Sequence, residues 1–199
     1  MKNQKQVWDN IAEEWHEFKQ RPSPHTSDFL KECEGKVLDL GSGSGRYLAK
    51  IKKGKMFLVD FSKRMIELAK KKAKKEKIDA EFSVSSFENL PYEDNFFDSA
   101  IASSSLHCIP KKQHKKVVKE LYRVIKKGAE AEISVWNRKS KRFKNAGKEK
   151  MIKWRDKGER YYYLFEEEEL KNLLTAVGFK IKKKLDSEMM IIFVVEKRR

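Results

Sequence analysis

The sequence has little of the material from which extracellular, metal-binding and membrane proteins are built. Its two cysteines, Cys33 and Cys108, are too far apart for a metal-ligand spacing or a disulfide framework, so we expect free thiols and no metal site. No apolar run approaches the length of a membrane span, and the N-terminus has no signal-peptide core. We therefore expect a cytoplasmic protein without membrane contact.

Acidic residues are too few to balance the basic ones. Lys and Arg number 46 against 30 Asp and Glu, which gives a net charge of +16. Such an excess favours a polyanionic partner, most often nucleic acid. A high content of Lys and Glu is also typical of proteins from hot environments, which explains many charges but not the imbalance of their sign.

Apolar residues recur with periods that alternate between strand and helix. We expect strands at 36–41, 56–60, 80–84, 96–103, 131–136, 179–185 and 190–195, and helices at 7–20, 25–34, 45–52, 62–77, 111–126 and 166–177. This alternation predicts an α/β fold with a parallel sheet. The last two strands are joined by only a few residues, which predicts a C-terminal antiparallel hairpin. We expect one domain over residues 1–199, with residues 1–34 as an N-terminal helical cap.

Basic and aromatic residues are concentrated in an expected insertion at residues 138–163. Residues 138–157 alone hold ten Lys or Arg against two acids, a net charge of +8. Phe143, Trp154 and three consecutive tyrosines accompany them. Cations for phosphates and rings for unstacked bases suit RNA. The alternative is a solvated, partly mobile insertion.

The most informative motif is a glycine-rich turn between two apolar strands. Gly41, Gly43 and Gly45 follow the first strand, and Asp60 ends the next. That order is typical of a Rossmann-like nucleotide site, in which Asp60 would accept hydrogen bonds from ribose hydroxyls. Asp39, two residues before the first glycine, suits a cationic ligand better than a pyrophosphate. The alternative is a purely structural glycine turn.

The acid-x-G-x-G-x-G pattern resembles the first motif of class I S-adenosylmethionine (SAM) methyltransferases. The resemblance implies a Rossmann-like, seven-stranded, mostly parallel sheet closed by the antiparallel hairpin, with SAM as the cofactor. The expected cofactor-binding residues are Asp39, Gly41, Ser42, Gly43, Gly45, Asp60, Phe61, Ser86, Phe87 and Ser103. The fourth strand is not followed by N/D-P-P-Y/F, which argues against methylation of the adenine amino group.

His107 follows the fourth strand, where the methyl acceptor is expected to sit. The ordinary pKa of an imidazole suits a group that either positions a substrate oxygen or acts as a base. The alternative is a histidine that is merely packed at the end of a strand. We expect His107 to be catalytic.

Several segments, spread over nearly the whole chain, resemble the tRNA wobble-uridine methyltransferases that esterify a 5-carboxymethyl group on uridine 34. They are residues 8–15, Lys19, 22–24, the glycine turn at 39–48, 106–108, Trp136, 160–165, Glu169 and Leu170. The sequence departs from that family at Lys19, Ser23, Cys108 and Tyr163. The resemblance implies tRNA as a partner. It also implies a small zinc-binding activator subunit, docked on apolar residues at the edge of the strand at 80–84.

A carboxylate acceptor is already ionised at neutral pH, so its methylation needs no strong base. Arg21, Lys19 and Arg160 are the candidates to hold it through charge-assisted hydrogen bonds. Tyr161 or Tyr162 would stack on a flipped base, and Trp136 and Arg138 complete the expected substrate site.

Two other functions stay open from the sequence. A small-molecule SAM methyltransferase would explain the glycine turn but not the charge of the insertion. A non-catalytic SAM-binding or RNA-binding protein would show no methyl turnover even with the right RNA.

Overall fold

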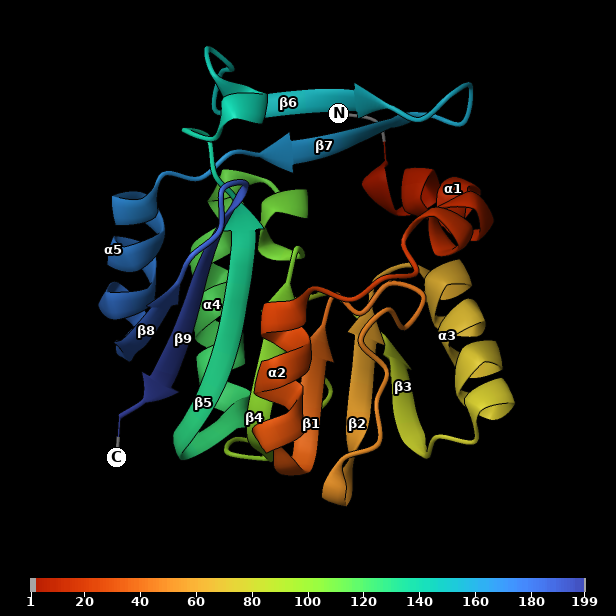
Figure 1. The fold of residues 1–199 in the computed structure, drawn as a ribbon, viewed down its shortest axis with the longest axis vertical. Helices are drawn as coiled ribbons and strands as arrows, with labels where there is room; N and C mark the ends of the chain where they lie inside the picture. The colour runs from red at the N-terminus through yellow and green to blue at the C-terminus, as the bar shows by residue number, and fades with distance from the viewer. Residues whose placement is uncertain (1–2, 199) are drawn as a thin grey trace.

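The computed structural model describes residues 3–198 and builds one seven-stranded sheet in the order β3-β2-β1-β4-β5-β9-β8 (Figure 1). The parallel strands are β1 (Glu34–Leu40), β2 (Lys52–Asp60), β3 (Ala80–Val84), β4 (Phe97–Ser103) and β5 (Ile125–Trp136). The last two strands, β8 (Phe179–Leu185) and β9 (Met190–Lys197), are antiparallel to their neighbours. The predicted fold class and its C-terminal hairpin are therefore confirmed.

Helices cover both faces of the sheet (Figure 1). They are α1 (Gln4–Phe18), α2 (Pro24–Glu32), α3 (Lys63–Glu76), α4 (Lys111–Val124) and α5 (Glu167–Val177). Successive side chains of a strand point to opposite faces. Leu38 of β1 therefore packs on the α4 and α5 side, whereas Val37 joins the cluster that includes Leu30 of α2 and Ala69 of α3. Among residues 3–198, no helix combines the length and apolarity that crossing a bilayer requires.

The helix expected over 45–52 is wrong, because the chain makes turns there and enters β2 at Lys52. Gly45 has a φ of +80°, and a Cβ at that position would lie 3.3 Å from the Cβ of Ala69. The Nζ of Lys72 also donates to the Gly45 carbonyl at 2.7 Å. Helix α3 therefore packs directly on this turn, and the left-handed backbone of Gly45 does not suit the interior of a helix.

Residues 138–163 form ordered structure between β5 and α5. A short 3-10 turn (Lys141–Phe143) precedes an antiparallel hairpin of β6 (Glu149–Lys153) and β7 (Glu159–Tyr163). The hairpin lies across the sheet edge at which the parallel strands end, beside α1 (Figure 1). The side chain of Gln4 in α1 binds both the Tyr161 N–H and the Glu159 carbonyl of β7. Helix α1 and the hairpin thus cover the edge where ligands of such sheets bind.

Candidate active site

A pocket opens at the carboxyl ends of β1, β2 and β4, next to α1. Of the residues predicted from the sequence, Lys19, Gly41, Ser42, Gly43, Asp60, Phe61, Phe87 and Ser103 line it. Trp8, Trp15, Ser44, Arg46, Tyr47, Met65, Ser104, Ser105 and Cys108 line it as well. The structure therefore brings most of the predicted cofactor residues together with Lys19, a predicted substrate residue.

The glycine turn is fixed against β2 by its own backbone. The N–H groups of Gly41 and Ser42 both donate to the Val59 carbonyl, at 2.8 and 3.1 Å. Gly41 has a φ of +79°, and a side chain there would collide with Ser105. At Gly43 the nearest atom to an added Cβ is 4.0 Å away, so this glycine leaves open space on the pocket side. A ligand can approach the backbone closely at such a position.

Asp60 connects the glycine turn to the start of α3. One carboxylate oxygen accepts the Gly43 N–H and the other accepts the Ser62 N–H, both at 2.9 Å. Its side chain is buried, and burial raises the pKa of Asp60 to about 6. Because a carboxylate oxygen has two lone pairs, Asp60 can still accept hydrogen bonds from ribose hydroxyls in the pocket that it lines.

Asp39 lies at the end of β1 but does not line the pocket. It is only 1% exposed, and its Oδ2 atom has no hydrogen-bond partner. Burial and the nearby Asp60 raise the pKa of Asp39 to about 8, against the opposing effect of Arg46 and Lys72. A buried acid with an unused oxygen favours a cationic ligand at this end of the pocket.

The pocket is also lined by cations. Lys19 and Arg46 line it, and burial together with Arg46, Arg142 and Arg160 lowers the pKa of Lys19. We call these four residues the cation cluster. Within residues 3–198, no carboxylate forms an ion pair with any of them. Adjacent cations without acids favour an anionic ligand.

Arg160 is enclosed by aromatic rings. Its guanidinium carbon lies 5.0 Å from the ring centre of Trp15 and 4.7 Å from that of Trp154, and Nη1 donates to the Tyr162 hydroxyl at 2.8 Å. The Nε atom of Arg160 and the indole Nε1 of Trp8 are both buried without a partner. Both groups are donors only, so they suit an acceptor such as a carboxylate.

His107 is buried beside this cage and does not line the pocket. Its Nδ1 accepts the Trp136 N–H at 2.9 Å, and its ring stacks on the Trp136 ring at 4.9 Å. Burial, followed by the nearby His114, lowers the pKa of His107 to about 3. The ring is therefore neutral at physiological pH and holds Trp136. A direct catalytic role for His107 stays a prediction.

The predicted tyrosines have no open ring face. Tyr162 is 1% exposed and stacks on Trp136 at 4.2 Å, and Tyr161 is 3% exposed within the core on the α4 side. The structure does not bring either ring into the pocket. Arg138 is also engaged, because its Nε donates to Glu166 at 2.8 Å.

Three further predicted residues lie outside the pocket. Arg21 is exposed, and its carbonyl accepts the Nε–H of Arg46 at 2.8 Å. Gly45 packs on α3. Ser86 lines an adjoining cavity of about 340 Å³ that shares Phe61 and Phe87 with the pocket. This adjoining cavity has room beside the two rings for the adenine of a nucleotide-like cofactor.

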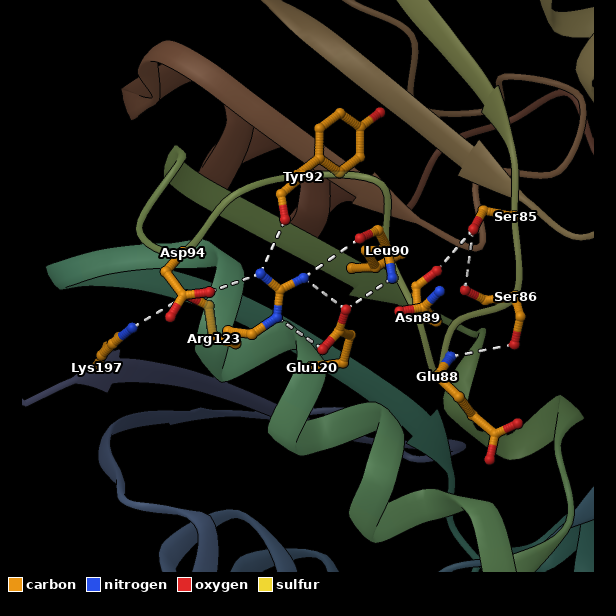
Figure 2. Close-up of polar contacts among 10 residues, drawn as sticks. All are labelled: Ser85, Ser86, Glu88, Asn89, Leu90, Tyr92, Asp94, Glu120, Arg123 and Lys197. Atoms are coloured by element: carbon orange, nitrogen blue, oxygen red, sulfur yellow. Dashed lines mark hydrogen bonds and ion pairs between the residues drawn. The ribbon is translucent and has the colours of Figure 1, made fainter.

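The loop that carries Ser86 and Phe87 is tied to α4 (Figure 2). The guanidinium of Arg123 donates to the carbonyls of Leu90 and Tyr92 and to the carboxylates of Glu120 and Asp94. Glu120 in turn accepts the Leu90 N–H at 2.7 Å. Arg123 and Glu120 of α4 therefore both hold the loop after β3.

Sequence reasoning missed Arg46, Arg142, Trp8 and Trp15. Arg46 directly follows the last glycine of the motif, which is a signal that could have been used. Trp8 and Trp15 have the spacing of the buried face of a helix. Such spacing predicts burial, but it does not predict that the buried face borders a pocket. Arg142 reaches the cluster from a distant segment, and its position depends on the hairpin.

Comparisons with known proteins agree with this geometry. The family described as "Methyltransferase domain" matches residues 37–128. A SAM-dependent methyltransferase structure from Methanosarcina mazei has a TM-score of 0.71 and 23% identity, covering 89% of this chain and 99% of that one. A structure described as a complex between the Haloferax volcanii Trm112 methyltransferase activator and the putative methyltransferase has a TM-score of 0.71 and 15% identity, covering 99% of this chain and 98% of that one. Residues 37–128 thus match a methyltransferase domain, and the solved structures share the fold.

Two curated relatives point to different acceptors. A tRNA (carboxymethyluridine(34)-5-O)-methyltransferase of Arabidopsis thaliana is 31% identical over 133 residues, which are 65% of this chain and 31% of that protein. A ubiquinone/menaquinone biosynthesis C-methyltransferase of Haemophilus ducreyi is 31% identical over 112 residues, 50% of this chain and 42% of that protein. The matched segments thus span less than half of these relatives.

S-adenosylmethionine is the cofactor of this domain, and the residues present fit it. Asp39 lies behind the pocket with an unpartnered Oδ2, Asp60 offers acceptors for ribose hydroxyls, and Gly43 leaves its backbone open. Among residues 3–198, no group of His, Cys, Asp or Glu side chains is suited to holding a metal ion.

Proposed function

We propose that this protein is a tRNA methyltransferase that esterifies the carboxylate of 5-carboxymethyluridine at the wobble position. The observation that carries the proposal is the cation cluster. Lys19 and Arg46 line the pocket, the charges of Arg142 and Arg160 reach Lys19, and no carboxylate of the described chain forms an ion pair with any of the four. The similarity to the Arabidopsis enzyme supports the same acceptor.

The cation cluster suits a carboxylate acceptor in particular. Arg160 and Trp8 each keep a buried donor unused, and leaving such donors without an acceptor is costly unless a ligand satisfies them. An anion bound there would accept from both groups and would lie near Lys19. Phosphate chemistry would satisfy the same donors, but a wobble uridine with a carboxymethyl group places a carboxylate next to the base.

The chain's residues then mainly align the reactants. When bound, SAM supplies the methyl group as an electrophilic sulfonium carbon. The carboxylate needs no deprotonation at neutral pH, which agrees with a neutral His107 that already uses its Nδ1 as an acceptor. The glycine turn and Asp60 hold the cofactor end, the cation cluster holds the acceptor end, and α1 excludes water between them.

The hairpin supports an RNA substrate. Its first strand, β6, belongs to the segment of residues 138–157 with a net charge of +8. The hairpin lies beside α1 over the sheet edge at which the parallel strands end (Figure 1). Backbone phosphates would contact its lysines, whereas the acceptor nucleotide would enter the pocket.

A small activator subunit is a proposed partner, docked along β3. This strand is hydrogen-bonded to β2 on one side and forms an edge of the sheet on the other. Val84 at its end is 46% exposed. A sheet edge with an exposed apolar residue suits β-strand addition by a partner. The Haloferax methyltransferase of similar fold was solved with such an activator.

Mass spectrometry of digested nucleosides tests the proposal. The protein is incubated with labelled SAM and tRNA bearing 5-carboxymethyluridine, with and without a small zinc-binding activator. A labelled methyl ester at the wobble uridine is the expected product. Binding of SAM without any product from this tRNA would reject the acceptor while leaving the cofactor assignment intact.

A small-molecule acceptor is the second candidate, favoured by the similarity to the Haemophilus C-methyltransferase. Methyl transfer that survives ribonuclease treatment would select it. A non-catalytic role would show SAM and RNA binding without turnover, even in the presence of the activator.

A further inference from the structure

Phe18 ends α1 with its ring largely in solvent. It is 64% exposed, against 46% for Val84 and 40% for Met151, the next large apolar side chains among residues 3–198. Exposing a phenyl ring to water has no benefit for folding. Its neighbour Lys19 lines the pocket, and the Nζ atom of Lys19 lies 5.2 Å from the Phe18 ring centre. Phe18 therefore stands on the rim of the candidate active site.

The ring of Phe18 is held by other aromatic rings. It lies 5.4 Å from Trp154 at an interplanar angle of 70°, and 6.1 Å from Trp15. Trp154 is itself fixed, because its indole N–H donates to Glu14 at 2.7 Å. An edge contact of this kind leaves a ring face available. Phe18 is thus an exposed ring with little conformational freedom to lose on binding.

The groove around Phe18 carries two cations and two acids. It has a volume of about 550 Å³ and is lined by Glu14, Glu17, Lys153, Trp154 and Arg155 as well as Phe18. Lys157, Arg155 and the Trp154 indole all contact the carboxylate of Glu14, which neutralises that acid. Lys153 has no ion pair in the described part of the chain and is free to meet a phosphate.

We infer that Phe18 is a stacking platform for an unpaired base next to the acceptor nucleotide. The inference rests on the proposed function in that the substrate is RNA, and it adds a second base subsite outside the pocket. When the acceptor nucleotide enters beside Lys19, a neighbouring base of the same single-stranded loop lies within reach of Phe18. Stacking on an aromatic ring tolerates any base, so this subsite contributes affinity and placement.

A binding cycle between protein and RNA tests the inference. Binding of a fluorescent anticodon stem-loop is measured by anisotropy without cofactor, for RNAs that are intact or abasic on either side of the wobble nucleotide. We expect Phe18→Ala to weaken binding of the intact RNA about tenfold. The same substitution has no effect on the RNA that is abasic at the stacked position. Phe18→Trp keeps the affinity of the original protein.

Met151→Ala is the matched control, because it removes an exposed apolar side chain from the hairpin beside α1, and Met151 does not line the groove around Phe18. If Phe18→Ala weakens binding of intact and abasic RNAs equally, or does not weaken it at all, the stacking assignment is overturned. The proposal that the substrate is RNA would not be affected by that result. A wild-type protein that binds none of these RNAs would overturn the RNA substrate and the platform together.

Discussion

Two groups of charged residues lie in and behind the pocket, one acidic and one basic. On the cofactor side, Asp60 lines the pocket and Asp39 lies behind it, and burial raises the pKa values of these carboxyls to about 6 and about 8. The acceptor end holds the cation cluster, which includes Arg160 with its unused Nε donor. Arg46 and Lys72 act on Asp39 as well, but they only partly offset the rise in its pKa.

This difference indicates which charge each ligand brings. SAM carries a sulfonium, an ammonium and a carboxylate group, and Asp39 and Asp60 suit its two cations. A carboxylate acceptor suits the other end. Because both ends are partly shielded from water, each charge pair interacts more strongly than it would in bulk solvent. Each prediction below changes one group of residues and compares the effect on SAM binding with the effect on the RNA substrate.

The largest effect is expected at Asp60. Asp60→Ala removes the acceptor of the Gly43 and Ser62 N–H groups and of the ribose hydroxyls, so we expect SAM affinity to fall at least about 100-fold. Isothermal titration calorimetry measures it. RNA affinity should change little, since the cation cluster is untouched. An unchanged SAM affinity would contradict the role assigned to this acid.

The next effect is expected at the opposite end. Arg160→Gln removes the caged positive charge, so we expect kcat/KM with carboxymethylated tRNA to fall about 30-fold. The Kd for SAM should stay within about twofold. Arg160→Lys keeps the charge and should recover part of the rate, which separates charge from packing. An equal loss of SAM affinity would mean that the two ends are not independent.

The cofactor end could be predicted from the sequence because backbone geometry determines it. The glycines, Asp39 and Asp60 stand at fixed places between strands, so their spacing alone indicates a site. The acceptor end depends on how α1 and the hairpin pack. Tyr161 and Tyr162 fit a stacking role in the sequence, but their rings are buried. Local spacing also predicted a helix at 45–52, but the chain makes turns there and Gly45 packs on Ala69 of α3.

A smaller effect, dependent on pH, is expected at Asp39. Its pKa of about 8 lies above the ordinary value of 3.8, so folding favours the protonated form. Unfolding above pH 4 therefore releases a proton, and the stability of the cofactor-free protein should fall as pH rises from about 4 to 8. Asp39→Asn abolishes this dependence and should raise Tm at pH 8 by about 3 °C or more.

The same variant should bind SAM more weakly. We expect calorimetry at pH 8 to show about a tenfold loss of affinity, because a neutral amide does not attract the positive charge of SAM as the Asp39 carboxylate does. Wild-type affinity should rise with pH through the range in which Asp39 ionises, and the variant should lose that rise. A variant that is less stable than the wild type at pH 8 would contradict the buried-acid account.

The smallest effect on ligand binding is expected behind the cofactor site, at Arg123. Arg123→Met removes the hydrogen bonds that tie the loop after β3 to α4, including those to the Leu90 and Tyr92 carbonyls (Figure 2). Its partners are partly solvated, so we expect a loss of about 1–3 kcal/mol in the free energy of unfolding. SAM affinity should fall only about threefold, through greater freedom of Phe87. RNA affinity should not change, and chemical denaturation beside calorimetry would measure both effects. A large loss of RNA affinity would show that the acceptor end depends on this loop after all.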